Sequence, residues 1–91
     1  NELEFLKLFP NPTSGEVTIM YYLPEQMDGA VVKVYDMLGR LVWAKAIDKK
    51  QGMQQANFNL NTLQKGNYLV LISAHKNGGV KNIANKTLIV K

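Results

Sequence analysis

Apolar and polar side chains alternate along most of this chain, which predicts β-strands rather than helices. The clearest strand is 16–23, where every second residue from Val17 to Leu23 is apolar and falls on one face. In the segment 67–75, Leu69 and Leu71 make the second face apolar as well, so both faces of this strand could be packed against other residues. The residues expected to point inward are Val17, Ile19, Tyr21, Leu23, Ala30, Val32, Val34, Ala56, Phe58, Leu60, Tyr68, Val70, Ile72 and Ala74.

Turn residues separate about seven short strands, a spacing typical of a sandwich or barrel. The strands are expected over 3–9, 16–23, 30–35, 41–47, 54–60, 67–75 and 80–91. Gly39 suits the left-handed position of a hairpin loop, and Asn77-Gly78 is a second hairpin signal. No segment has the apolar period of a convincing amphipathic helix.

The segment Leu60–Tyr68 decides between sandwich and barrel. A leucine, then Gly66, then Tyr68 at the head of the next strand is typical of a tyrosine corner. In that motif the phenol bonds to the backbone a few residues upstream, as in immunoglobulin-like domains. We therefore predict an all-β fold, an immunoglobulin-like antiparallel β-sandwich of about seven strands.

Composition adds one asymmetry to this picture. The 91 residues fit one domain, and their 46% hydrophobic content argues against disorder. Residues 1–48 contain all seven acids and four bases, a charge of −3, whereas residues 49–91 contain seven lysines and no acid, a charge of +7. The basic half fits either an anion-binding tail or a solvated lysine-rich edge that keeps strands from pairing with other chains.

Candidate chemistry is sparse. The chain has no cysteine, which excludes disulfides and thiolate sites, and His75 is its only histidine. The acids are scattered, and no phosphate-binding glycine loop or nucleophile elbow is present. Tyr21, Tyr22, Tyr35 and Trp43 could form an aromatic platform, but we favour Tyr21 in the core and the others on sheet faces. We predict no enzyme activity, no cofactor, no metal, no nucleic-acid partner and no transmembrane segment.

Four motifs carry a resemblance to a known family. They are Phe9–Gly15, Val34–Arg40, Leu60–Tyr68 and Lys86–Lys91, and they cover nearly the whole chain. In this order and spacing they resemble the C-terminal sorting domain of the type IX (Por) secretion system, type A. Carried over to this chain, the sorting motifs are Pro10, Asn11, Pro12 and Gly15, then Gly39, Gly66 and Tyr68, and finally Lys86, Val90 and Lys91.

The resemblance implies a secretion signal in Gram-negative bacteria of the Bacteroidetes group. Such a domain directs a larger, covalently joined cargo through the periplasm and the outer-membrane translocon. Its implied partners are the translocon, shuttle components and a sortase, which removes the domain and joins the cargo to surface lipopolysaccharide; some cargo is released instead. Residues 8–91 would be the sorting domain, and residues 1–7 a linker or sortase-cleavage region from upstream cargo, since the chain opens in mid-pattern.

The functional hypothesis concerns the terminal strand. Gly39, Gly66 and Tyr68 are interpreted as structural, whereas the acid-free strand Lys81–Lys91 is expected to be recognised, by strand pairing or by an acidic receptor surface. The alternative interpretation is a protected edge strand, and an open edge also offers a route to dimers. The alternative functions are an accessory immunoglobulin-like adhesion or carbohydrate-binding module, a passive spacer and, more remotely, a hydrolase.

Overall fold

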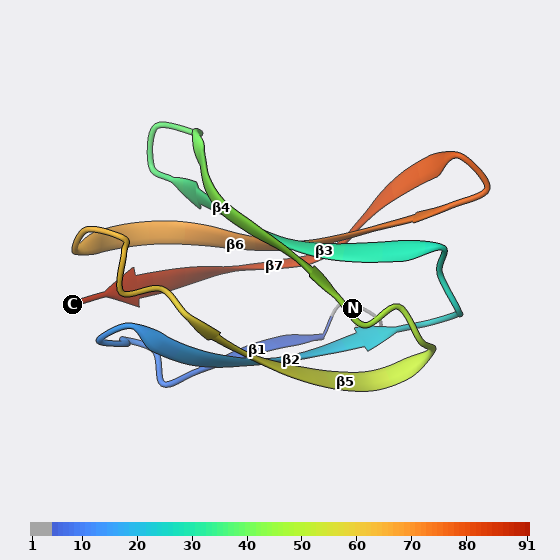
Figure 1. Cartoon of the computed structure of the whole chain (residues 1–91), viewed down its shortest axis with the longest axis horizontal. Coiled ribbons are helices and arrows are strands. Elements are labelled where there is room, and N and C mark those ends of the chain that lie inside the picture. Colours follow the sequence, from blue (N-terminus) through green and yellow to red (C-terminus); the bar gives the residue numbers. More distant parts are fainter. Residues whose placement is uncertain (1–4) are drawn as a thin grey trace.

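Two antiparallel β-sheets lie face to face in the computed structural model, which describes residues 5–91 (Figure 1). The predicted all-β sandwich of seven strands is confirmed. The strands are β1 (Leu6–Phe9), β2 (Glu16–Leu23), β3 (Gly29–Asp36), β4 (Leu41–Ile47), β5 (Gly52–Asn59), β6 (Gly66–Lys76) and β7 (Gly79–Val90).

The strand order distributes the chain between a three-stranded sheet, β1-β2-β5, and a four-stranded sheet, β4-β3-β6-β7. Hairpins join β3 to β4 and β6 to β7, whereas the connections after β2, β4 and β5 cross from one sheet to the other. Adjacent strands pair antiparallel in both sheets. Strand β7 is therefore an edge strand of the larger sheet, and β1 is an edge strand of the smaller one.

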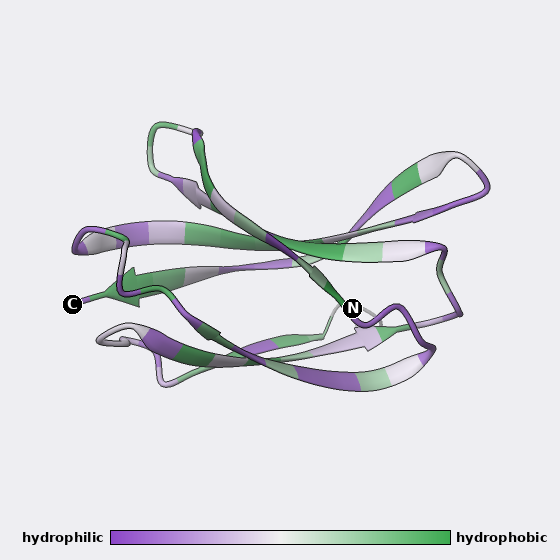
Figure 2. Ribbon diagram, viewed as in Figure 1, coloured by the Kyte–Doolittle hydropathy of each residue, from purple (hydrophilic) through white to green (hydrophobic). Residues whose placement is uncertain are grey.

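The core fills the space between the two sheets. Of the residues predicted to point inward, thirteen are buried, and Ala56 is partly buried against them. The alternation is visible along the strands in Figure 2. Burying one aliphatic side chain completely stabilises the folded state by about 1.5–3 kcal/mol relative to leaving it exposed. The alternation is therefore enough to fix which face of each strand points inward. The sequence also allowed the outer face of β6 to be buried, but Leu69 on that face is exposed.

The first strand is shorter than predicted. It starts at Leu6, where the sequence suggested 3–9, and residues 1–4 lie outside the described part of the chain. Leu6 and Lys7, which fall in the range interpreted as linker, pair with Tyr21 and Met20 of β2. Within residues 5–91 there is no helix that could span a membrane.

Candidate functional site: one end of the sandwich

All four sequence motifs meet at one end of the sandwich, on the left in Figure 1, where the C-terminus also lies. They form the β1–β2 connector (residues 10–15), the β3–β4 hairpin loop (residues 37–40), the β5–β6 corner (residues 60–65) and the end of β7 (residues 86–91). We call this the motif end. Each motif can be identified separately in the sequence; only the topology brings the four together.

The connector is hydrogen-bonded along the outer edge of β7. The backbone N–H of Thr13 donates to the Ile89 carbonyl and the N–H of Lys91 donates to the Thr13 carbonyl, each at 2.9 Å. The side chain of Asn11 extends this pairing: its Nδ2 donates to the Thr87 carbonyl at 2.9 Å, and its Oδ1 accepts from the Ile89 N–H at 3.0 Å. Asn11 and Thr13, which we call the clamp, thus occupy edge groups of β7 from residue 87 to residue 91.

The connector is itself fixed from within. Thr13 is almost fully buried, and its hydroxyl donates to the Glu16 carbonyl and accepts from the Gly15 N–H. Gly15 has a φ of 147°, and a Cβ there would approach Asn61 Cβ to 3.2 Å. Its carbonyl accepts from the Leu60 N–H at 2.8 Å, so the connector is bonded to the corner as well as to β7. Pro10 and Pro12 flank Asn11, and both prolines lack an N–H that would need a partner.

The corner has the geometry that the sequence predicted. Tyr68 is buried, and its phenol donates to the Gln64 carbonyl four residues upstream, which confirms the tyrosine corner. Gly66 has a φ of 157°, which lies in the region that favours glycine. Gly66 and Tyr68 pair with Val90 and Leu88, so the corner also positions the end of β7.

The hairpin loop is organised around one carboxylate. Asp36 accepts from the N–H groups of Leu38 and Arg40, and from the Arg40 guanidinium at 2.7 Å. The Arg40 backbone N–H is the largest of the causes that hold the pKa of Asp36 below its ordinary value, and the guanidinium adds to it. Gly39 closes the turn with a φ of 82°, as its sequence context predicted. The charge of Asp36 is therefore engaged within its own loop.

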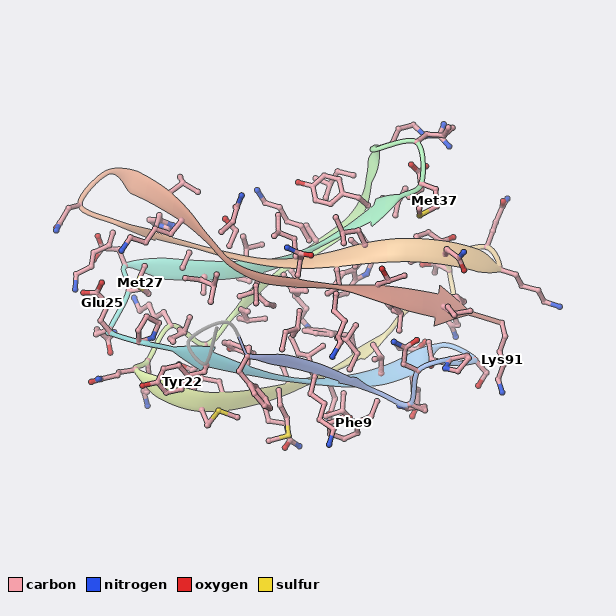
Figure 3. The ribbon with its side chains drawn as sticks, turned by 180° about the vertical axis from the view of Figure 1, so that it is seen from behind. Phe9, Tyr22, Glu25, Met27, Met37 and Lys91 are labelled. Atoms are coloured by element: carbon pink, nitrogen blue, oxygen red, sulfur yellow. The ribbon has the colours of Figure 1, made fainter. Side chains whose placement is uncertain are left out.

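The predicted terminal residues have three different environments. Val90 belongs to the core. Lys86 has the register of the inward-facing residues of β7, and its ammonium lies 3.4 Å from the Leu6 carbonyl, where it bridges the edges of the two sheets. Lys91 is exposed at the end of the chain, on the same side of the molecule as Met37 in Figure 3.

A comparison with known families decides the classification. A family model described as the secretion system C-terminal sorting domain matches residues 7–90. The chain belongs to this family. The resemblance drawn from the four motifs is thus confirmed, and the sorting domain is a signal for type IX secretion. The family consists of sorting tags and is not a catalytic one. No curated protein matches the chain.

The four-stranded sheet of this sorting domain is nearly free of acidic groups. Asp36 is the only carboxylate in residues 29–47, and residues 49–91 contain none. Asp36 is already paired with Arg40. The lysines Lys33, Lys65 and Lys91 therefore have no acid of this sheet to pair with. Lys76 and Lys81 of the same sheet lie near Glu25 of the β2–β3 loop, so the positive charge of this sheet that has no nearby acid is found toward the motif end.

The four aromatic residues considered for a binding platform do not form one. Tyr21 is buried in the core, where its hydroxyl donates to the Asp48 carbonyl at 2.8 Å; burial and the Asp48 charge raise its pKa to about 12. Tyr22 and Tyr35 are half-buried on different sheets, and Trp43 packs edge-on against Phe58 with ring centroids 5.0 Å apart. In the described residues, no three histidine or carboxylate side chains are grouped as a metal site would require.

The clamp is not evident from the sequence, although its residues lie in a motif that the sequence singles out. Asn11 has the turn chemistry expected of its position, yet its amide completes a strand edge formed by residues at least 76 positions away. Thr13 was not among the predicted site residues. A threonine between turn residues gives no signal of burial, because that depends on which strand lies beside it.

Proposed function

We propose that this sorting domain directs a larger cargo, joined upstream, through the outer-membrane translocon, and that the secretion machinery recognises its motif end. The observation that carries the proposal is the convergence of the four motif segments around the end of β7. Hydrogen bonds from the connector and the corner hold that strand in one position. A surface fixed in this way has the same shape whatever cargo precedes it.

Two modes of recognition are open to the terminal strand, strand pairing and charge. Strand pairing needs free backbone groups at the edge of β7. The clamp occupies such groups from Thr87 to Lys91, which confines pairing to the upstream stretch of β7 unless the clamp opens. The exposed Lys91 favours the second mode, in which an acidic surface of a translocon or shuttle component approaches this end.

The remaining steps follow from the same proposal. The cargo passes through the periplasm, and a sortase cuts upstream of Leu6, because Leu6 and Lys7 are part of β1 and their removal would open the smaller sheet. The cargo then stays on the cell surface or is released. Dimers, if they form, would use an edge outside the clamped part of β7. The alternative adhesion or carbohydrate-binding role finds little support, because the half-buried tyrosines lie on different sheets.

A secretion assay tests the proposal. Residues 1–91 are fused behind a signal peptide and a fluorescent reporter, and expressed in a strain with an intact type IX system and in a translocon mutant. We expect reporter on the surface or in the medium of the first strain only. Reporter retained in the periplasm of both strains, with the domain shown to be folded by protease resistance, would contradict the proposed function.

A further inference from the structure

A cavity of about 420 Å³ opens on the outer face of the four-stranded sheet at the motif end. It is lined by Tyr35, Asp36, Met37, Gly39, Tyr68, Leu69 and Thr87. These residues come from three of the four motifs or directly adjoin them: the hairpin, the corner and the start of the terminal motif. Its lining is mainly apolar, and its volume is within the range of sites that hold a small ligand or a large side chain.

Exposed apolar side chains are frequent in the elements that line this cavity. Six of the ten large hydrophobic residues that are exposed in residues 5–91 lie on the hairpin, on β4 or on neighbouring parts of β6 and β7. They are Met37, Leu38, Leu41, Val42, Leu69 and Ile89. The strand register brings three of them to one face, since Leu41 and Leu69 both pair with Tyr35, and Ile89 is two residues from Thr87, the partner of Leu69. Isolated exposed apolar residues need no explanation, but a group on one face indicates an interaction surface. Met37 at the rim is unbranched and can adapt its shape to a bound group.

We infer that this cavity binds an apolar side chain from an acidic segment of the secretion machinery. The inference rests on the proposed function and names the partner's chemistry. The charge comes from the sheet itself, whose only carboxylate, Asp36, is engaged by Arg40, while Lys33 and the loop and terminal lysines carry the positive charge. An apolar residue flanked by aspartate or glutamate matches both the cavity and its surroundings.

A second copy of the domain is a poorer occupant. A twofold dimer through this face would place the same surface against itself. It would bring Lys33 and Arg40 of one copy toward like charges of the other. The four-stranded sheets of the two copies have no free carboxylate to compensate. The partner is therefore a different protein, and self-association becomes one of the outcomes that would contradict the inference.

The chain offers a matched pair of variants. Met37 and Val80 are exposed to nearly the same extent, 69% and 71%, but Val80 lies in the β6–β7 hairpin at the opposite end. Both Met37→Glu and Val80→Glu should leave folding unchanged, which thermal unfolding of the purified domain checks. In the secretion assay we expect Met37→Glu to lower surface reporter about tenfold, as loss of an interface anchor does. Val80→Glu should leave it within about twofold of the unsubstituted domain.

Crosslinking identifies the occupant. A photoreactive phenylalanine analogue at Leu69, or at Val80 as control, is activated in cells exporting the fusion, and the crosslinked peptide is sequenced. We expect Leu69 to capture a segment of an outer-membrane component that contains leucine, isoleucine or phenylalanine beside acidic residues. A basic or uniformly polar segment, or a second copy of the domain, would overturn the inference. So would normal export of Met37→Glu. Failed export of the unsubstituted domain would instead refute the proposed function.

Discussion

Backbone hydrogen bonds join segments at both ends of the sandwich, but the side chains that accompany these bonds differ. At the motif end, the connector, corner and terminal strand are joined mainly by backbone hydrogen bonds, with Thr13 and Tyr68 buried among them. At the opposite end, the N–H groups of Met27 and Asp28 donate to the Lys49 and His75 carbonyls at 3.0 and 2.8 Å. There Glu25, in the β2–β3 loop, also pairs with Lys76 of β6 at 2.6 Å and lies 3.9 Å from Lys81 of β7. Exposed ion pairs contribute little to the stability of the fold and weaken in salt, whereas hydrogen-bonded backbone groups hold the segments in a fixed position. Figure 3 shows Glu25 and Lys91 at these opposite ends.

The ends also differ in the distribution of acids. Glu25, Asp28 and Asp48 all lie in the loops opposite the motif end, where Lys49, Lys50 and Lys76 accompany them. At the motif end, Asp36 is engaged with Arg40, whereas Glu16 at the start of β2 and Lys91 are both exposed. The motif end therefore combines a connector hydrogen-bonded to β7 with an exposed Lys91 on a larger sheet whose own carboxylate is engaged. The opposite end carries none of the four motifs and has three acids among its lysines, which makes it the natural internal control.

The largest effect should come from the core beneath each end. Leu88 of β7 and Leu23 of β2 are both fully buried, at the motif end and the opposite end respectively. Replacing either with alanine should lower the free energy of unfolding by about 2–5 kcal/mol, measured by urea denaturation. At a temperature where both variants are folded, only Leu88→Ala should reduce export, because it loosens the strand that carries the terminal motif. Equal export of the two would remove the functional distinction between the ends.

Opening the clamp is the next most severe change. Asn11→Ala removes the partners of the Thr87 carbonyl and the Ile89 N–H. This should lower the free energy of unfolding by about 1–2 kcal/mol. Hydrogen exchange should show faster exchange of the Ile89 and Lys91 amides, with the β3–β6 pairing unaffected. The control is Asn85→Ala, an exposed asparagine of β7 outside the clamp, which should change stability by less than about 0.5 kcal/mol. Unchanged exchange at Ile89 would mean that Asn11 does not hold the edge.

Replacing one glycine at each end compares their effects on export at an equal expected loss of stability. Gly39 at the motif end and Gly78 at the opposite end have φ values of 82° and 80°, and a Cβ added at either would have open space within 4 Å, apart from its chain neighbours. Alanine at either site should cost about 1 kcal/mol through backbone conformation alone. Because only Gly39 lines the apolar cavity, export should fall with Gly39→Ala and not with Gly78→Ala. The secretion assay and thermal unfolding measure the two quantities separately.

The smallest effect on the stability of the fold comes from the two engaged carboxylates. The folded structure lowers the pKa of both Asp36 and Glu25, the first chiefly through the Arg40 backbone N–H and the second through the Lys76 side chain. Since each pKa is lowered, each carboxylate stabilises the fold above its unfolded pKa, and this contribution is lost as the pH falls through the folded pKa. At about 1 M salt, where screening extends over only ~3 Å, NMR titration should show the Glu25 pKa returning toward its ordinary value more than that of Asp36. Equal salt sensitivity would contradict the assignment of causes.

Local patterns predicted the strands well because burial on one face repeats with a period of two. Alternation placed Val17, Ile19 and Tyr21 in the core. The Gly66–Tyr68 motif predicted that the phenol bonds to the backbone a few residues upstream, and the structure shows Gln64 as the partner. What the sequence could not supply was the lateral order of the strands. The clamp depends on β7 lying beside the connector, a contact between the two ends of the chain.

Lys86 illustrates the same limit. Its charge suggests little connection to the core, yet it occupies an inward register between Ala84 and Leu88, and its ammonium reaches the Leu6 carbonyl. An inward position at a sheet edge cannot be recognised without knowing that β7 is the edge. The cavity was invisible for a similar reason, because Met37, Leu69 and Thr87 are neighbours only across three strands.

The most direct test of motif-end recognition is to reverse one charge at each end. Lys91 and Lys50 are both exposed, at the motif end and the opposite end. In the secretion assay, with folding verified for both variants, we expect Lys91→Glu to retain most of the reporter in the periplasm. Lys50→Glu should be exported like the unsubstituted domain. Equal export of the two variants would contradict recognition of the motif end through its positive charge.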